Sequence, residues 1–246
     1  MSIHSNKPAS TVQVKAFVAA VVVAGVAAVA TSIWPVQHAD LIRFASFLVL
    51  GAVASTCKIK LPGHDGSMSV NLPYILLSVA LLPVAQAMAV AGASVIAQSF
   101  WTSRNRVRAL QLVFNLAMMA CAVRLAATVY TTSLHLESVA NVMGHLLVAG
   151  LAYFAVNTVA TAAVMALASG QSLAKVWSEI FNLTFPYYVL GTMMAAVGTM
   201  MSQYAGWQVP LAALPVLYAV YRSYRLYFGA AVRAAEPEAM MAAAAR

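Results

Sequence analysis

The sequence predicts an all-α fold, a polytopic transmembrane helical bundle of about eight spans, two of them short, with no soluble domain. Three observations predict it. Hydrophobic residues make up 63% of the 246 residues and charged residues only 8%, whereas soluble domains carry about 25% charged residues. The apolar residues fall in runs long enough to cross a membrane, which takes roughly 20 residues. The Lys and Arg residues lie mainly in the loops between these runs.

The first predicted span covers about residues 15–34 and the second about 41–57. Residues 1–14, with Lys7 and Pro8, are expected to form a short polar tail. Ala28–Ala30 resembles a signal-peptide cleavage site. The length of the first apolar run and the spans that follow it favour a retained membrane helix instead.

The most polar internal stretch is Lys58–Pro73, which contains two glycines and two prolines. Glycine and proline punctuate turns, so one interpretation is a turn-rich cytoplasmic loop. The other is a segment that folds back into the bundle and caps a cavity. Non-helical backbone is tolerated at membrane depth when protein buries it, and the two interpretations stay open.

In residues 74–101 we predict two short helices separated at Pro83. They form either two full spans or a re-entrant pair. Four further spans are predicted. Between the spans at about 139–168 and 185–204, we expect the stretch "GQSLAKVWSEIFNL" (170–183) to form a short amphipathic helix at the interface. The four spans cover about residues 109–130, 139–168, 185–204 and 209–228. The whole bundle therefore extends over residues 15–229, and residues 230–246 are expected to be a second tail.

The distribution of positive charge predicts the orientation, because cytoplasmic loops are enriched in Lys and Arg. With both termini inside and eight crossings, the inner loops hold the basic residues, including the trio Arg104, Arg106 and Arg108. The outer loops hold no Lys or Arg. We expect a multi-pass protein of the bacterial inner membrane with cytoplasmic N- and C-termini.

Catalytic and metal-binding signatures are absent from the sequence. It contains no HExxH, GxSxG or P-loop motif, and Cys57 and Cys121 are too far apart to suggest a metal site or a disulfide framework. No nucleic-acid-binding motif accompanies the net charge of +8. We expect a protein that is not an enzyme and does not bind nucleic acid, and nothing in the sequence argues for a cofactor.

A few polar residues inside apolar runs are the candidate ligand-binding residues. Arg124 is the sharpest, because an intramembrane charge tends to face the bundle interior or a cavity. A long side chain near a helix end can instead extend to the interface. Asn115, His145 and Asn157 are further candidates, although polar residues also hydrogen-bond neighbouring helices. Gly191, Ala195 and Gly198 form a small-residue stripe that predicts close helix packing.

The chain resembles a known family in three stretches. "VASTCKIKLPGHDGSMSVNLPYILLSVALLP" (Val53–Pro83), "RALQLVFNLAMMACAV" and "FPYYVLGT" are similar to the membrane-embedded sensor region (MASE-like) that precedes bacterial HD-GYP phosphohydrolases and GGDEF diguanylate cyclases. "LPVLYAVYRSYRLYF" (Leu214–Phe228) resembles its last helix, which there leads into the signalling domain. A looser similarity exists to the substrate-binding components of energy-coupling-factor transporters, whose capping loop faces outward.

This resemblance implies a sensory module, either free-standing or cut at the boundary of a signalling domain, and we expect it to be non-enzymatic and to act through a separate partner. A small hydrophobic or amphipathic ligand would bind among Arg124, Asn115, His145 and Asn157, with Lys58–Pro73, including Asn71, as a lid. One alternative is a transporter or substrate-capture subunit. A second is a structural accessory subunit of a membrane complex. The lipid bilayer is a partner in each case, and the ligand and protein partner are not identified by the sequence.

Overall fold

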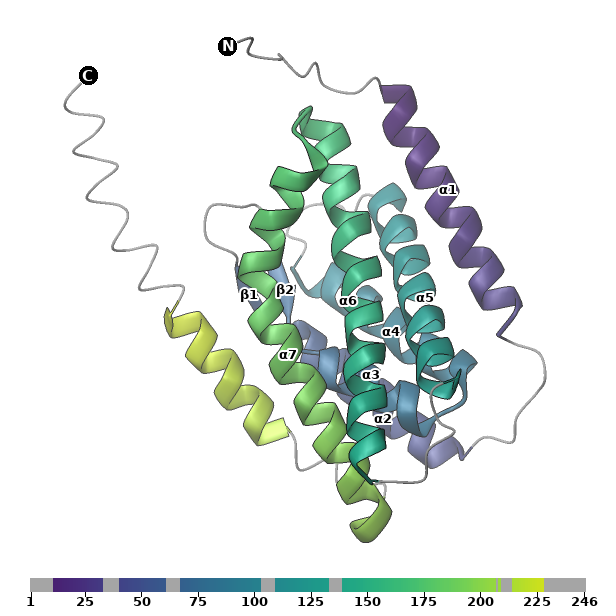
Figure 1. Cartoon of the computed structure of the whole chain (residues 1–246), viewed down its shortest axis with the longest axis vertical. Coiled ribbons are helices and arrows are strands. Elements are labelled where there is room, and N and C mark those ends of the chain that lie inside the picture. The colour runs from purple at the N-terminus through teal and green to yellow at the C-terminus, as the bar shows by residue number, and fades with distance from the viewer. Residues whose placement is uncertain are drawn as a thin grey trace, which may run out of the picture.

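The structure is a computed structural model that describes residues 11–32, 40–60, 67–102, 109–132, 139–206, 208 and 214–227. Helices dominate this part of the chain, so the predicted all-α bundle is confirmed (Figure 1). Its elements are α1 (Thr11–Ala30), α2 (Leu41–Thr56), β1 (Lys58–Lys60), β2 (Ser67–Ser69), α3 (Leu72–Leu81), α4 (Val84–Thr102), α5 (Ala109–Thr132), α6 (Val139–Ser169) and α7 (Leu173–Ala205). A last helix, residues 214–227, follows and is named the C-terminal helix below.

Five of these helices are long and apolar enough to cross a membrane, namely α1, α4, α5, α6 and α7. In Figure 1, α5, α6 and α7 lie side by side along the long axis, and α1 and the C-terminal helix lie at opposite edges of the bundle. With 31 and 33 residues, α6 and α7 measure about 46 and 50 Å at a rise of roughly 1.5 Å per residue. Both exceed a hydrocarbon core of about 30 Å.

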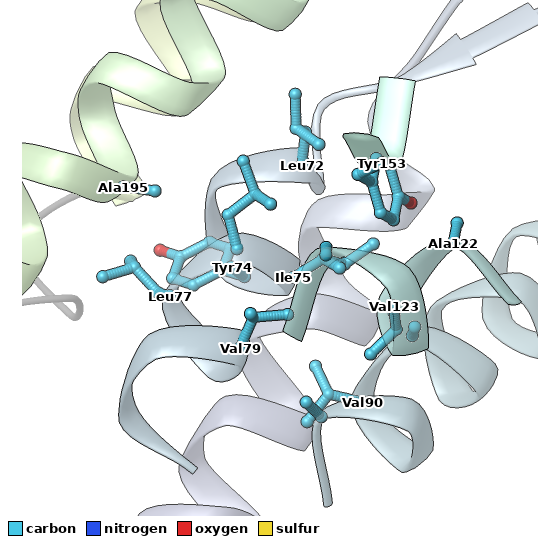
Figure 2. Close-up of a cluster of buried hydrophobic side chains, with 14 of the residues drawn as sticks. Leu72, Tyr74, Ile75, Leu77, Val79, Val90, Ala122, Val123, Tyr153 and Ala195 are labelled. Atoms are coloured by element: carbon cyan, nitrogen blue, oxygen red, sulfur yellow. The ribbon is translucent and has the colours of Figure 1, made fainter. Parts of the chain in front are cut away.

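The short helix α3 lies at the centre of the bundle. Eight consecutive residues from Leu72 to Val79 are buried, so every face of the helix packs against protein. Its side chains point toward Val90 of α4, Val123 of α5 and Ala195 of α7 (Figure 2). With ten residues it covers only about 15 Å, which is half the thickness of the hydrocarbon core. The prediction of short helices on either side of Pro83 is therefore correct for α3, and α3 is a buried half-length helix.

The helix α3 packs against the small-residue stripe of α7, which consists of Gly191, Ala195 and Gly198. A Cβ atom on Gly191 would lie 2.8 Å from a methyl group of Leu72, and one on Gly198 would lie 3.0 Å from a methyl group of Leu77. Ala195 between them is fully buried. The stripe thus does what its spacing predicts, because small residues let helices approach closely.

Two short antiparallel strands connect α2 to α3. Lys58 pairs with Ser69, and Ile59 pairs with Met68. The side chains of Ile59, Met68 and Val70 are buried, so the described part of the segment Lys58–Pro73 is packed into the bundle. This favours the fold-back interpretation over a loop exposed to water, and residues 61–66 lie outside the described part.

The expectation of a separate interfacial helix at 170–183 is wrong. Residues from Leu173 onward are the first turns of α7, which continues through Pro186 to Ala205. Val176 and Ile180 pack against Ala162 and Ala166 of α6, and this buried stripe continues without a break into the later turns. Pro186 lies on the exposed face, where its ring and its missing N–H disturb no contact with α6 or α3.

The boundaries predicted for the spans 41–57, 109–130 and 139–168 agree with α2, α5 and α6 to within two residues. α1 begins at Thr11, inside the stretch expected as the first tail, and ends at Ala30. The remaining residues of the tails and the basic trio of the α4–α5 loop lie outside the described residues. The orientation in the membrane and the domain limits stay predictions.

Candidate functional site

Three tyrosines from α6 and α7, together with Asn157, form a buried polar group inside the bundle, named here the tyrosine cluster: Tyr153, Tyr187, Tyr188 and Asn157. The amide of Asn157 donates a hydrogen bond to the hydroxyl of Tyr188 across α6 and α7. The Tyr153 hydroxyl lies 2.9 Å from the sulfur of Met119 on α5. The cluster therefore joins three of the long helices at membrane depth, where a polar group needs a protein partner.

Tyr187 connects the cluster to α3. Its hydroxyl accepts a hydrogen bond of 3.2 Å from the backbone N–H of Leu72, the first residue of α3. Pro73 has no N–H, and the N–H groups of Tyr74 and Ile75 donate to the carbonyl of Asn71. Every N–H group in the first turn of α3 therefore has a hydrogen-bond acceptor. The carbonyl of Asn71 accepts from Tyr74 and Ile75, and Tyr187 of α7 accepts from Leu72.

The opposite side of Tyr187 contacts the C-terminal helix. The rings of Tyr187 and Tyr224 meet edge to face, with centroids 6.4 Å apart and planes at 84°. Leu214, Leu217, Tyr221 and Tyr224 belong to the stripe of this helix that packs against the central core. Tyr187 therefore touches both the buried helix α3 and the last helix of the chain.

A groove runs between α6 and α7 beside Tyr188, named here the α6–α7 groove. Its volume is about 30 Å³, and four residues of each helix line it at i, i+3, i+4 and i+7 spacing: Leu147, Gly150, Leu151, Phe154, Phe185, Tyr188, Val189 and Thr192. Leu151 and Val189 on its rim are 53% and 41% exposed. Because exposed apolar side chains of a membrane protein face lipid, the groove is reached from the bilayer.

Aromatic side chains continue from the groove along α7. Phe154 contacts Phe185 at 5.8 Å and Tyr188 at 4.7 Å between ring centroids, both edge to face. Phe181 stacks on Phe185 at 4.7 Å. Such pairs add about 0.5–1.5 kcal/mol beyond the area that they bury, so they stabilise the packing of α6 against α7 beside the groove.

The structure separates the sequence-predicted site residues into two groups. Asn157 belongs to the tyrosine cluster, and Asn71 adjoins it as the residue before α3, where its side chain makes no capping hydrogen bond. Arg124 is half-buried and donates a hydrogen bond of 3.4 Å to the hydroxyl of Ser32, just after α1. Asn115 precedes Arg124 by nine residues, which places the two on opposite faces of α5. The contacts thus do not bring all five residues around one cavity.

His145 is buried with 7% exposure. Among the described residues, three buried side-chain polar atoms have no hydrogen-bond partner: Nδ1 of His145, Oε1 of Gln86 and Nε of Arg43. His145 does not line the α6–α7 groove.

The strand pair lies next to the tyrosine cluster and is polar on one side. The hydroxyl of Ser69 lies 2.7 Å from the amide oxygen of Gln98 near the end of α4. Burial lowers the pKa of the Lys58 ammonium. These contacts hold the strands against α4 while α3 leaves them toward the opposite end of the bundle.

The arrangement suits binding and transmission of movement. Tyrosine hydroxyls, an asparagine amide and apolar walls recognise shape and hydrogen bonds. No group of three or more His, Cys, Asp or Glu residues that could hold a metal ion occurs within the described ranges. Sequence reasoning missed the tyrosines of "PYY" (Pro186–Tyr188), which directly follow the proline inside α7 and contact different neighbours. Two adjacent tyrosines inside an apolar run were the available signal.

Comparison with known proteins adds one positive finding. The family model MASE9, which describes a membrane-associated sensor family, matches residues 38–227. No curated protein and no solved structure matches the chain. The predicted resemblance to membrane-embedded sensor regions is therefore confirmed, whereas similarity to energy-coupling-factor components is not shown.

Proposed function

Because the chain belongs to the MASE9 family, we propose that it is a non-enzymatic membrane sensory module that binds a small apolar or amphipathic molecule from the bilayer. The binding site is the α6–α7 groove, and a partner that contacts the C-terminal helix receives the signal. The observation that carries this proposal is the groove itself, which is open to lipid at Leu151 and Val189 and floored by Tyr188.

The dimensions of the groove restrict the ligand. A volume of about 30 Å³ is far below the roughly 300–1,000 Å³ of pockets that enclose drug-sized ligands. It accommodates one methyl branch or a short stretch of a chain, and the rest of the molecule would lie along the exposed rim in the bilayer. A branched or unsaturated lipid-like molecule meets this requirement.

Tyr188 gives the groove a polar contact. Its side chain is 9% exposed, and its hydroxyl accepts a hydrogen bond from Asn157. A tyrosine hydroxyl both donates and accepts, so a ligand oxygen that reaches the Tyr188 hydroxyl would meet a hydrogen-bond donor. An amphipathic molecule with a carbonyl or hydroxyl oxygen is therefore favoured over a pure hydrocarbon.

Filling the groove tests the proposal. Val189→Trp places a bulky side chain on the rim, whereas Val197→Trp changes a residue of similar exposure, 45%, on the same helix outside the groove. We expect native mass spectrometry in mild detergent to show a small-molecule adduct on the wild type and on Val197→Trp, and its loss from Val189→Trp. An adduct retained by Val189→Trp, or absent from the wild type, would contradict the proposal.

A further inference from the structure

The tyrosine cluster contains two consecutive residues that face different parts of the bundle. Tyr188 lines the α6–α7 groove, while Tyr187 caps α3 and contacts the C-terminal helix. Consecutive residues of a helix are separated by about 100° around its axis, so a rotation of α7 at the groove displaces both side chains together.

We propose that Tyr187 is a positioning residue that couples the N-terminus of α3 to the C-terminal helix. The direction of the signal, from the groove to the C-terminal helix, rests on the proposed function. The coupling itself does not, because it is a property of the protein without ligand and is measured without one.

The hydroxyl of Tyr187 is the side-chain group that satisfies the Leu72 N–H, and Leu72 is 3% exposed. Water cannot replace the hydroxyl at so buried a position without a local rearrangement. An unsatisfied buried donor is unfavourable, so α3 keeps its position only while Tyr187 keeps its own. The strand β2 ends at Ser69, three residues before α3 begins at Leu72.

The ring of Tyr187 is held in turn by Tyr224. The C-terminal helix is peripheral, since Tyr218, Leu226 and Tyr227 are 57–71% exposed. A shift of this helix therefore displaces few side chains other than those on its inner stripe. Tyr224 is the member of that stripe whose ring contacts Tyr187, which makes the pair a direct link between a surface helix and the buried α3.

Hydrogen–deuterium exchange of the full chain in lipid nanodiscs tests the coupling. Tyr187→Phe keeps the ring and removes only the hydroxyl, and we expect exchange of residues 67–81 to rise about tenfold. Tyr224→Ala removes the supporting ring, and we expect exchange of the same residues to rise about threefold. Tyr218→Ala, on the exposed face of the same helix, serves as the matched control and leaves residues 67–81 unchanged.

The double variant Tyr187→Phe/Tyr224→Ala separates coupling from two independent effects. If Tyr224 acts through the hydroxyl of Tyr187, the double variant exchanges at residues 67–81 no faster than Tyr187→Phe alone. Coupling is reciprocal, so Tyr187→Phe also raises exchange within residues 214–227. Unchanged exchange of residues 67–81 in Tyr224→Ala, or a double variant that shows the product of the two single effects, would overturn the proposal.

These outcomes are distinct from those that test the ligand. If exchange is coupled but no adduct is found, Tyr187 is a coupling residue and the groove is not a binding site. If the adduct depends on the groove but exchange is not coupled, the groove is a ligand site and Tyr187 does not connect it to the C-terminal helix.

Discussion

Gly25 of α1 lies directly against Ala117 of α5. A Cβ atom at Gly25 would be 2.6 Å from both the Cα and the Cβ of Ala117, and 2.7 Å from its carbonyl oxygen. Backbone atoms cannot move aside as the tip of a flexible side chain can, so the absence of a side chain at Gly25 sets the distance between the two helices. The contact lies seven residues before the hydrogen bond of Ser32 with Arg124 on the same pair of helices.

We expect Gly25→Ala to detach α1 from α5. The substitution forces the two backbones apart, and this outweighs the gain of about 0.5–1 kcal/mol that alanine brings to a helix interior. A single cysteine at Ala28, labelled with a thiol reagent after replacement of Cys57 and Cys121, would react faster in the variant. Gly144→Ala is the control, because a Cβ there meets no atom within 4 Å and leaves only the helix-forming gain. Equal labelling of both variants would contradict the assignment.

The central position of α3 predicts a stability difference between two isoleucines. Ile75 is fully buried, whereas Ile42 at the start of α2 is 72% exposed. We expect Ile75→Ala to lower the free energy of unfolding by about 2 kcal/mol, near the lower limit of values for buried isoleucine, because the unfolded side chain would be solvated by lipid. Ile42→Ala should change it by less than about 0.5 kcal/mol. Equal thermal stabilities in detergent would show that α3 is not packed as described.

The sequence predicted the helices well because lipid imposes a simple rule. Every backbone N–H and C=O at membrane depth must be satisfied within the protein, so long apolar runs such as Ala109–Thr132 and Val139–Ser169 form helices almost regardless of context. The pattern could not show that Leu72–Leu81 is buried on every side, since an apolar helix faces lipid or protein with the same composition. The continuation of α7 through Pro186 was also missed, because the packing of Val176 and Ile180 against α6 is a tertiary contact.

The candidate site was predicted only in part, for a related reason. Arg124 was the most conspicuous residue because a charge in an apolar run is rare, yet its described contact is with Ser32. Asn157 was identified and does join the tyrosine cluster. Tyr187 gave a weaker signal, the adjacent pair of tyrosines, and its partner Leu72 lies 115 residues away in the sequence.

Arg124 is expected to stabilise the end of α1 without contributing to ligand binding. Its hydrogen bond to Ser32 is long, at 3.4 Å, and the side chain is half-buried, so Arg124→Gln should lower the free energy of unfolding by less than about 1 kcal/mol. The small-molecule adduct seen by native mass spectrometry should have the same mass and occupancy as in the wild type. Loss of the adduct in Arg124→Gln, with the fold intact by circular dichroism, would restore Arg124 to the binding site.

The pair of Asn157 and Tyr188 is expected to show a measurable interaction free energy. Asn157→Leu removes the amide that donates to Tyr188, and Tyr188→Phe removes the hydroxyl that accepts. Interhelical hydrogen bonds in membranes contribute about 0.6–2 kcal/mol, so we expect a coupling of that size in a double-mutant cycle of unfolding free energies in detergent. Thr161, which donates to the Asn157 carbonyl, provides the control substitution Thr161→Val. Additive effects of Asn157→Leu and Tyr188→Phe would show that the pair does not hold α6 and α7 together.

The last prediction concerns Pro186, which directly precedes the two tyrosines that contact α3 and line the groove. A proline inside a helix removes one backbone hydrogen bond and bends the helix, and Pro186 is exposed, so no packing contact is lost on substitution. Pro186→Ala should therefore raise the free energy of unfolding by about 1–3 kcal/mol. We expect the restored backbone hydrogen bond to shift the Tyr187 hydroxyl relative to the Leu72 N–H, so hydrogen exchange of residues 67–81 should rise although the protein as a whole becomes more stable. Val189→Ala, a change at an exposed residue three positions later, should alter neither the free energy of unfolding nor the exchange of residues 67–81 by a comparable amount. If stability and protection of residues 67–81 rise together in Pro186→Ala, Pro186 does not set the position of Tyr187.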